Sequence, residues 1–437
     1  MTEIVISEVR HTELKTKLKG DTERFAALYL NHDRANDRFL VSSFDIASES
    51  DCVSASETAI TITPEFLMRV TRKAKETRTH LALLHTHLFG YKRFSSIDDD
   101  VEQALNHVVR LRLPESTVFA MVLCDDSLIT RRFSTHEEIP VRIVGRNVHI
   151  PGENSINDDE LKRFDRQVRA FGSYGQSVLQ KMKVAIVGVG GTGSILVQQL
   201  AHLGIRDFVL IDPDVVESSN LNRVVGTSAD SIGRQKVEVS AELIRRITPN
   251  PRIVMLADSV IGIEAKNLLT SADCVFSCTD SHSSRAFISE LAYAYLVPTF
   301  DIGVAISADK GEIKSITGRC QMLAPGLPCL LCSNAIDGRA VREELMTPEE
   351  SKADPYFRGD GVRQPAVISL NSTMVSLAVT MFLSVFTGVP ATSRWSTYDA
   401  MRGVVRSLGG SPNADCPFCG SDEACAAGDT WRLSFIR

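Results

Sequence analysis

The sequence predicts two successive α/β domains, the second built around a doubly wound sheet of parallel strands. From about residue 160, continuous apolar runs such as "KVAIVGVG" and "DFVLID" alternate with helix-like stretches, as in parallel sheets covered on both faces. Before about residue 135, shorter runs such as "FLVSSFDIA" and "LALLHTHL" alternate with polar, helix-like stretches. This second pattern indicates a smaller α/β domain of antiparallel or mixed strands.

The chain has 437 residues, which is enough for two or three domains that each have a core. We expect the first domain over residues 1–135, a linker over 136–160 and the second domain over 161–437. The expected linker, "HEEIPVRIVGRNVHIPGENSINDDE", is polar and contains Pro and Gly.

Composition and charge argue against several classes of partner. The net charge of −6 gives no general attraction to nucleic acid or to an anionic membrane. No continuous apolar run approaches the ~18–20 residues that span a bilayer, and the N-terminal residues lack the order of a signal peptide. We therefore expect a cytoplasmic protein whose ten cysteines are thiols or metal ligands rather than disulfides.

A glycine-rich turn follows the first predicted strand of the second domain. Gly188-x-Gly190-x-x-Gly193 comes directly after a strand and opens a helix, where a phosphate can approach bare backbone N–H groups. The next strand ends in Asp212, about twenty residues beyond the third glycine, where an acid commonly accepts the ribose hydroxyls. The pattern predicts a nucleotide site, with a glycine-rich turn that binds nothing as the alternative.

Charged residues farther along favour adenylation over hydride transfer. Arg223 and Lys236 can place positive charge around the α-phosphate of ATP, and Asp280, in "CTDSHSSR", can hold Mg²⁺. A dehydrogenase has no obvious use for this set. A dehydrogenase and a non-catalytic module that only binds ATP and a partner remain the alternatives.

Together, "RFDRQ", "KVAIVGVGGTGS", "LIDPDVVESSNLNR", "GRQKVE" and "CTD" resemble the Rossmann-like adenylation domain of ubiquitin-activating-type enzymes. That family includes the ThiF- and molybdopterin-synthase-type adenylyltransferases, and the resemblance covers residues 160 to 430. It implies the following binding residues: Gly188, Gly190, Gly191 and Gly193 for the phosphates, Asp212 for the ribose, Asn220, Arg223 and Lys236 for the triphosphate, and Asp280 for Mg²⁺. It also implies a homodimer in which Arg166 reaches the ATP of the other subunit.

The chemistry implied by this resemblance is attack of a carboxylate on ATP. The carboxylate would be the C-terminus of a small ubiquitin-like β-grasp protein ending in glycine, and the products would be an acyl-adenylate and pyrophosphate. Positioned charge would supply most of the acceleration. Activation of a sulfur-carrier protein for cofactor biosynthesis uses the same adenylate and remains an alternative.

Family members often pass the acyl group to a cysteine in a crossover loop, which should fall near residues 346–366. That stretch contains no cysteine. Cys320 and Cys425 are the remaining C-terminal candidates, because Cys274 and Cys278 belong to an apolar strand where burial is the commoner fate. The adenylate could instead pass to another protein, such as a conjugating-enzyme-like acceptor.

Two Cys-x-x-Cys pairs lie near the end of the chain, in "PCLLC" and "CPFCG". Four thiolates are the ligand set of a tetrahedral structural zinc. We therefore expect Cys329, Cys332, Cys416 and Cys419 to hold a structural zinc. The resemblance to the adenylyltransferases implies that this zinc knuckle ties the C-terminal tail to the second domain. A redox Cys-x-x-Cys is the alternative.

Two histidines alternate along a predicted strand of the first domain. His85 and His87 project to the same side of that strand, so both imidazoles can reach one ion. Asp98, on the following helix or loop, can supply a third ligand. The fourth place then stays open, as a catalytic zinc site requires.

This arrangement, His-Thr-His, ten residues and Asp, with Ser95 three residues before the aspartate, resembles the motif of the JAMM (MPN/JAB) metalloproteases. Members of that family are zinc isopeptidases that cut ubiquitin-like proteins from targets or trim their precursors. The resemblance implies that Ser95 stabilises the oxyanion and that Glu23 is the general base for the attacking water, with Glu49 and Glu57 as runners-up. Leu88 stands where the family usually has proline.

The two resemblances together predict a bifunctional enzyme with ATP, Mg²⁺ and Zn²⁺ as cofactors. Its second domain would adenylate a ubiquitin-like protein, and its first domain would process or release that protein. The alternative for the first domain is a scaffold that has lost activity and only docks a partner.

Overall fold

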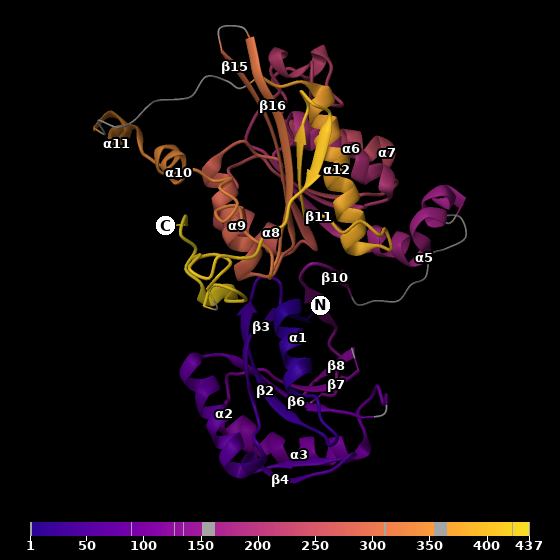
Figure 1. Cartoon of the computed structure of the whole chain (residues 1–437), viewed down its shortest axis with the longest axis vertical. Coiled ribbons are helices and arrows are strands. Elements are labelled where there is room, and N and C mark those ends of the chain that lie inside the picture. The colour runs from indigo at the N-terminus through magenta and orange to yellow at the C-terminus, as the bar shows by residue number, and fades with distance from the viewer. Residues whose placement is uncertain are drawn as a thin grey trace.

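Two eight-stranded sheets organise the computed structural model, one near each end of the chain (Figure 1). The structure describes residues 2–88, 90–125, 127–133, 135–150, 162–309, 312–353, 365–421 and 423–436. The N-terminal part and the larger C-terminal part stack along the long axis, and the last segment of the chain lies at their junction (Figure 1).

The first sheet has the strand order β10-β9-β1-β3-β2-β6-β7-β8 and mixes parallel with antiparallel pairs, as predicted. Its strands are β1 (Glu3–Ser7), β2 (Phe25–Asp33), β3 (Arg38–Ile46), β6 (His80–Thr86), β7 (Val118–Cys124), β8 (Ser127–Arg132), β9 (Val141–Val144) and β10 (Val148–His149). A separate hairpin consists of β4 (Cys52–Ala55) and β5 (Ile60–Ile62). Its helices are α1 (Glu8–Lys17), α2 (Pro64–Thr77) and α3 (Ser96–Arg112).

The segment expected to be a linker, 136–160, differs from that expectation. Strands β9 and β10 lie within it, and β9 pairs in parallel with β1 at the other end of the domain. Val141 and Val144 are buried in this pairing. The partner strand of β9 lies about 140 residues away, so no local pattern predicts the pairing. The polar residues and the Pro beside β9 are typical of a loop, and they led to the prediction of a linker. Residues 151–160 of the expected linker lie outside the described residues.

The second sheet has the order β13-β12-β11-β14-β15-β16-β17-β18. Its strands are β11 (Lys183–Val187), β12 (Asp207–Ile211), β13 (Arg252–Leu256), β14 (Cys274–Ser277), β15 (Thr299–Asp309), β16 (Glu312–Leu323), β17 (Trp395–Asp399) and β18 (Val404–Ser407). The pairs from β13 to β15 are parallel, as predicted for a doubly wound Rossmann-like sheet. The antiparallel extension from β16 to β18 was not predicted.

Strand β13 contains a continuous apolar run, yet it is an exposed edge of the sheet. Val254 and Met255 of β13 are 40% and 42% exposed, because β13 ends the sheet and pairs only with β12. A run of apolar residues does not distinguish an edge strand from a central one, since only the neighbours decide burial.

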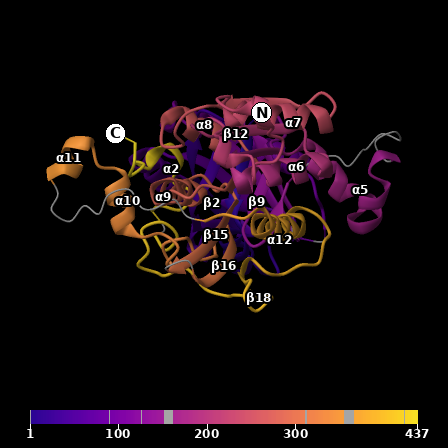
Figure 2. The same cartoon turned by 90° about the horizontal axis from the view of Figure 1, so that it is seen from above.

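Helices cover both faces of this sheet, and others lie at the periphery of the domain. The helices described in this domain are α5 (Asp165–Lys181), α6 (Gly191–Leu203), α7 (Lys236–Ile247), α8 (Ile263–Thr270), α9 (His282–Ala294), α10 (Gly338–Glu344), α11 (Pro348–Ala353) and α12 (Ile368–Phe386). Helices α6, α7 and α12 lie on one side, and α8 and α9 lie on the other (Figure 1). The view from above places α5 and α11 at opposite ends of the molecule (Figure 2).

Helix α12 is long and apolar enough, by length and composition, to cross a membrane. Polar residues such as Asn371 and Ser372 interrupt its apolar residues, so it contains no long continuous apolar run. Half of the most apolar stretch of α12 is buried inside the protein. The ring centroid of Phe382 lies 5.5 Å from that of Phe276 and 5.9 Å from that of Phe300. These contacts are those of a helix that covers a sheet.

Buried charges join the two sheets. Arg142 of β9 places Nη2 2.7 Å from Oδ1 of Asp273, which precedes β14, and donates from Nε to Oε1 of Glu3 over 2.9 Å. Arg38 of β3 lies in the same group, 3.3 Å from Glu3. Breaking such a buried network leaves uncompensated charge, so it fixes one relative placement of the two domains.

Candidate functional site

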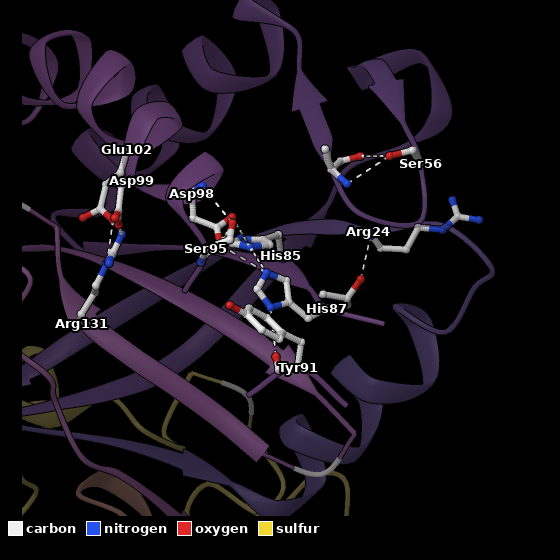
Figure 3. Close-up of polar contacts among 12 residues, drawn as sticks. Arg24, Ser56, His85, His87, Tyr91, Ser95, Asp98, Asp99, Glu102 and Arg131 are labelled. Carbon is white, nitrogen blue, oxygen red and sulfur yellow. Dashed lines mark hydrogen bonds and ion pairs between the residues drawn. The ribbon is translucent and has the colours of Figure 1, made fainter. Parts of the chain in front are cut away.

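The two histidines and the aspartate of the first domain converge on one point (Figure 3). His85 is in strand β6 and His87 directly follows the end of that strand, while Asp98 is in the first turn of α3. The two Nε2 atoms lie 3.0 Å apart, and Nε2 of His85 lies 2.9 Å from Oδ1 of Asp98. The three ligand atoms lie within 4.8 Å of one another, and two imidazoles with one carboxylate are a donor set that zinc accepts.

Further hydrogen bonds orient the side chains of His87 and Asp98. Nδ1 of His87 lies 3.1 Å from the carbonyl oxygen of Tyr91, to which it can donate, so that Nε2 faces the cluster with its lone pair. Ser95 is the N-cap of α3: its hydroxyl accepts from the amide of Asp98 and donates to Oδ2 over 2.7 Å. The local sequence thus explains why a serine precedes the aspartate by three residues, since this is a capping box.

A buried ion pair holds the beginning of α3 against the sheet. Arg131 of β8 lies 2.6 Å from Asp99 and 2.5 Å from Glu102, with Glu102 4% exposed (Figure 3). Phe94 packs against the guanidinium at 3.9 Å. The sequence analysis missed this group, because no spacing rule connects β8 with α3.

Glu23 lies just before β2 and lines the same small cavity as His85 and Asp98. The residue is 4% exposed. Burial raises the pKa of its carboxyl group, and the nearby histidines oppose that rise. The two runners-up, Glu49 and Glu57, are both exposed, so Glu23 is the one of the three glutamates that the fold brings to the cluster.

In the second domain, β11 leads through Gly188 into α6. The φ angle of Gly188 is 83°, and a Cβ atom there would lie 2.9 Å from the carbonyl oxygen of Cys278. A Cβ atom at Gly193 would lie 1.9 Å from the carbonyl oxygen of Gly188. Gly190 faces open space and begins α6 without a side-chain cap. The loop is therefore tight on its inner side and open where backbone N–H groups can receive a phosphate.

Two side chains close this loop from the side. A Cβ atom at Gly191 would lie 2.7 Å from Nδ2 of Asn371 and 3.1 Å from Cδ of Arg223. Arg223 is thus at the phosphate loop, and its Nη1 donates to the carbonyl oxygen of Ser219 over 2.6 Å. Asn371 comes from α12 and is 4% exposed. No sequence signal pointed to it, since α12 is remote in the chain.

Asp212 lies at the end of β12, directly beneath the loop. Its carboxylate accepts from the amide of Val189 over 2.8 Å and from that of Asp214 over 2.9 Å. Burial raises the pKa of Asp212, and the charge of Lys236 opposes the rise. Lys236 begins α7 and pairs with Asp214 at 2.7 Å. The fold therefore gathers these charges at the carboxyl ends of β11 and β12.

The other predicted nucleotide residues differ in their surroundings. Asn220 is buried, and its Oδ1 accepts from the amide of Glu217 over 3.1 Å. Asp280 is exposed in the loop between β14 and α9, two residues after Cys278, which contacts Gly188. Arg166 is exposed in the first turn of α5. Its role toward another subunit stays a prediction.

Comparison with known proteins identifies the family. The model of the ThiF family matches residues 164–418, which is more than half of the chain. The chain belongs to the ThiF family. The match begins after the first sheet, so the histidine–aspartate cluster lies outside it.

Relatives of this ThiF-family chain carry related names. Molybdopterin-synthase adenylyltransferase of Escherichia coli is 30% identical over 61% of this chain and 98% of its own length. SAMP-activating enzyme E1 of Haloferax volcanii is 26% identical over 61% of this chain and 91% of its own length. Adenylyltransferase and sulfurtransferase uba4 of Emericella nidulans is 34% identical over 31% of this chain and 29% of its own length.

The ThiF-family domain brings its two cysteine pairs together. Sγ of Cys329 lies 3.4 Å from that of Cys416, and Sγ of Cys332 lies 3.4 Å from that of Cys419. All four sulfurs lie within 4.8 Å of one another. A tetrahedral zinc with Zn–S bonds of about 2.3 Å separates its sulfurs by about 3.8 Å, so the donor set and its spacing fit such an ion.

The cysteines considered for a thioester lie in different surroundings. Cys274 and Cys320 are buried in β14 and β16, and burial raises the pKa of Cys320 to about 12. Burial raises the pKa of Cys278 as well. Cys425 lines a groove between the first domain and the C-terminal segment. Of the crossover loop expected near 346–366, residues 354–364 lie outside the described residues.

Proposed function

We propose that the chain uses ATP to adenylate the C-terminal carboxylate of a small sulfur-carrier or ubiquitin-like protein. The observation that carries this proposal is the glycine-rich loop at the start of α6. Arg223 and Asn371 lie next to Gly191 of this loop, and the carboxylate of Asp212 accepts a hydrogen bond from the amide of Val189. The names of the relatives favour the sulfur-carrier alternative over the combination of processing and activation that the sequence analysis placed first.

Each residue has a simple task in this reaction. The open amides at the start of α6 bind phosphate oxygens, and Arg223 and Lys236 hold the triphosphate while charge develops at the α-phosphate. Asp212 accepts from the ribose hydroxyls. Mg²⁺, when bound at Asp280, neutralises phosphate charge. The incoming carboxylate is already a nucleophile, so positioning does most of the work and no general base is required.

The test is ATP–pyrophosphate exchange by the purified chain with candidate carrier proteins. We expect exchange with a carrier that ends in glycine and none with the same carrier lacking its last residue. The matched protein variant is Arg223→Gln, which should abolish exchange without changing the fold. Failure of every β-grasp carrier encoded beside this chain to stimulate exchange would contradict the proposal.

We also propose that the first domain is a zinc-dependent isopeptidase that trims or releases the same carrier. The convergence of His85, His87 and Asp98 beside buried Glu23 supports this second function. Zinc, when bound by these residues, would activate water and polarise the scissile carbonyl. Glu23 would take the proton of the attacking water and pass it to the leaving amine. The Ser95 hydroxyl, which donates to Oδ2 of Asp98 in this structure, would turn to donate to the oxyanion.

Metal content and cleavage test this second function together. We expect wild-type protein to shorten a carrier precursor, or to release a carrier from a lysine side chain, and His85→Ala to lose both zinc at this site and cleavage. His107→Ala, on the exposed face of α3, is the matched control. Zinc content that is unchanged by His85→Ala would leave the first domain as a scaffold.

A homodimer is a further part of the proposal, with Arg166 of each subunit at the ATP of the other. Equilibrium sedimentation gives the oligomeric state. Arg166→Ala should then weaken exchange in the dimer, and an active monomer would contradict this part.

A further inference from the structure

The chain continues beyond its second cysteine pair into the junction of the two domains. Ala424, Ala426 and Ala427 are each at most 2% exposed. The amide of Ala426 donates to the carbonyl oxygen of Tyr293 in α9, while its own carbonyl accepts from Nδ2 of Asn31 in β2, both over 3.0 Å. One residue of this segment therefore touches both domains.

Asp429 makes the same bridge with its side chain. Oδ2 accepts from the backbone amide of Arg34, in the turn between β2 and β3, over 2.9 Å. Oδ1 accepts from Nζ of Lys266 in α8 over 2.8 Å and from the hydroxyl of Tyr295 over 3.0 Å. Hydrogen bonds to an ionised carboxylate are about twice as strong as neutral ones, so this carboxylate ties the turn of the first domain to two elements of the second.

The residue before Asp429 shows how closely the segments approach. Gly428 has a φ angle of 54°, and a Cβ atom there would lie 3.0 Å from the carbonyl oxygen of His32. A side chain at this position would push the turn away from the segment. On the far side, Trp431 and Ser434 donate to Glu290 of α9, so the segment is anchored beyond the bridge as well.

The anchor on the near side is the cysteine cluster. Only six residues, 420–425, separate Cys419 from Ala426. Cys416 and Cys419 lie against Cys329 and Cys332, which belong to the second domain. A short connecting segment restricts how far its two ends can move relative to each other, whereas a long one does not. The position of the cysteine cluster therefore restricts the position of Ala426.

We propose that Ala426–Asp429 is an interdomain clasp that the cysteine cluster holds in place. The clasp presses the β2–β3 turn of the first domain against α8 and α9 of the second. Binding of metal to the four cysteines stabilises the clasp because it binds the folded arrangement and not the released one. Metal at the end of the chain therefore controls how tightly the N-terminal domain is seated. This follows neither from adenylation nor from peptide cleavage.

A second group of contacts makes the inference specific. The far edge of the domain interface depends on Arg142 with Asp273 and on Arg394, whose Nη2 donates to Asn147 over 2.8 Å. None of these four residues belongs to the clasp. Releasing the clasp should loosen the β2–β3 turn, which keeps the hydrogen bond from Nδ2 of Asn36 to Oγ1 of Thr270 over 2.7 Å, and should leave strand β9 protected.

Hydrogen exchange of the full-length chain, followed by mass spectrometry, tests this. We compare wild type with Cys416→Ser and Asp429→Asn, and measure zinc in each. Asp399→Asn, which alters an exposed pair with Arg402, is the control. We expect both clasp variants to raise the exchange rate of peptides covering residues 31–37 by about tenfold, the loss of one charge-assisted hydrogen bond. Peptides of β9 should be unchanged in Asp429→Asn, which keeps the metal-bound fold.

Zinc content separates the two variants. Cys416→Ser should lose zinc, whereas Asp429→Asn should keep it and still release the turn. An unchanged turn in Asp429→Asn would overturn the clasp. An unchanged turn in Cys416→Ser, after loss of zinc, would overturn its control by metal. Faster exchange in peptides of β11 and α6 of Cys416→Ser would mean that loss of zinc loosens the second domain itself. The Asp429→Asn variant, which keeps its zinc, then tests the clasp by itself.

Discussion

The two clusters that can hold a metal are built in opposite ways. The cysteine cluster has four donors from two segments that lie far apart in the sequence, and it offers no place for another ligand. The histidine cluster has three donors, all from residues 85–98, and it lies beside a cavity that Glu23 lines. A closed set joins distant segments, while an open set leaves room for water and substrate.

The surroundings of the cysteine cluster and of the histidine cluster also differ. Cys329 and Cys416 belong to a buried apolar group with Tyr293, Leu323 and Leu330. The cavity beside the histidines is lined mainly by apolar residues but also by four ionisable ones, which are Glu23, His85, Asp98 and Glu102. The first cluster therefore stabilises packing, and the second can take part in chemistry. Substitutions should affect stability at one cluster and activity at the other.

The largest effect should come from Cys416→Ser. Loss of one thiolate leaves three donors for a structural zinc, whose binding contributes directly to folding. We expect zinc to fall by one per chain and the free energy of unfolding to fall by about 4 kcal/mol or more. Zinc analysis and urea unfolding measure both quantities, with Cys52→Ser as the control. A variant that keeps its zinc would show that these four cysteines do not form one site.

Glu23→Gln should have the next largest effect, and on activity alone. The amide cannot take a proton, so peptide cleavage should fall by about 10²- to 10⁴-fold. Zinc content and thermal stability should stay at the wild-type values, because Glu23 is not one of the three ligands. Glu57→Gln, on the exposed turn of the hairpin, should cleave normally. Equal loss of activity in both variants would remove Glu23 from the mechanism.

The sequence predicted the clusters better than it predicted their neighbours. His85, His87 and Asp98 lie at the end of one strand and the start of the next helix, and each cysteine pair spans four residues, so local spacing sufficed. The glycines of the phosphate loop were identified in the same way. Short spacing determines geometry because a strand and a helix turn have fixed repeats.

Contacts between remote segments could not be predicted in this way. Nothing in the sequence connects Asn371 with Gly191, or Asp429 with the turn at Arg34. Strand β9 was taken for a linker because its pairing partner is β1. These features depend on which helices and strands become neighbours in the fold. The pattern of apolar and polar side chains predicts only that an element has a buried face, not what packs against that face.

Lys236→Met should reduce adenylation and leave both metal clusters intact. Removing one charge that stabilises the transition state costs about 10²- to 10³-fold in rate. We expect ATP–pyrophosphate exchange to fall by that factor while zinc content stays constant. Lys314→Met is a suitable control, because Lys314 is 49% exposed and pairs with Glu312 in the β15–β16 hairpin. Normal exchange by Lys236→Met would separate the lysine from the nucleotide site.

The smallest effect, about tenfold, concerns pH and Asp212. Burial raises the pKa of this carboxyl group above its usual range, so it takes up a proton at a higher pH than an exposed aspartate does. Protonation leaves one oxygen fewer to accept from the ribose, and ATP affinity should fall as the pH decreases through this raised pKa. The raised pKa has the opposite sign for folding: the native state holds this proton more tightly than the unfolded chain, so protonation of Asp212 favours the fold. A loss of affinity in acid, with an unchanged circular dichroism spectrum, would therefore be a binding effect. An affinity that stays constant while Asp212 takes up its proton would mean that Asp212 does not contact the nucleotide, and the adenylation site would then depend on the loop and its two cations.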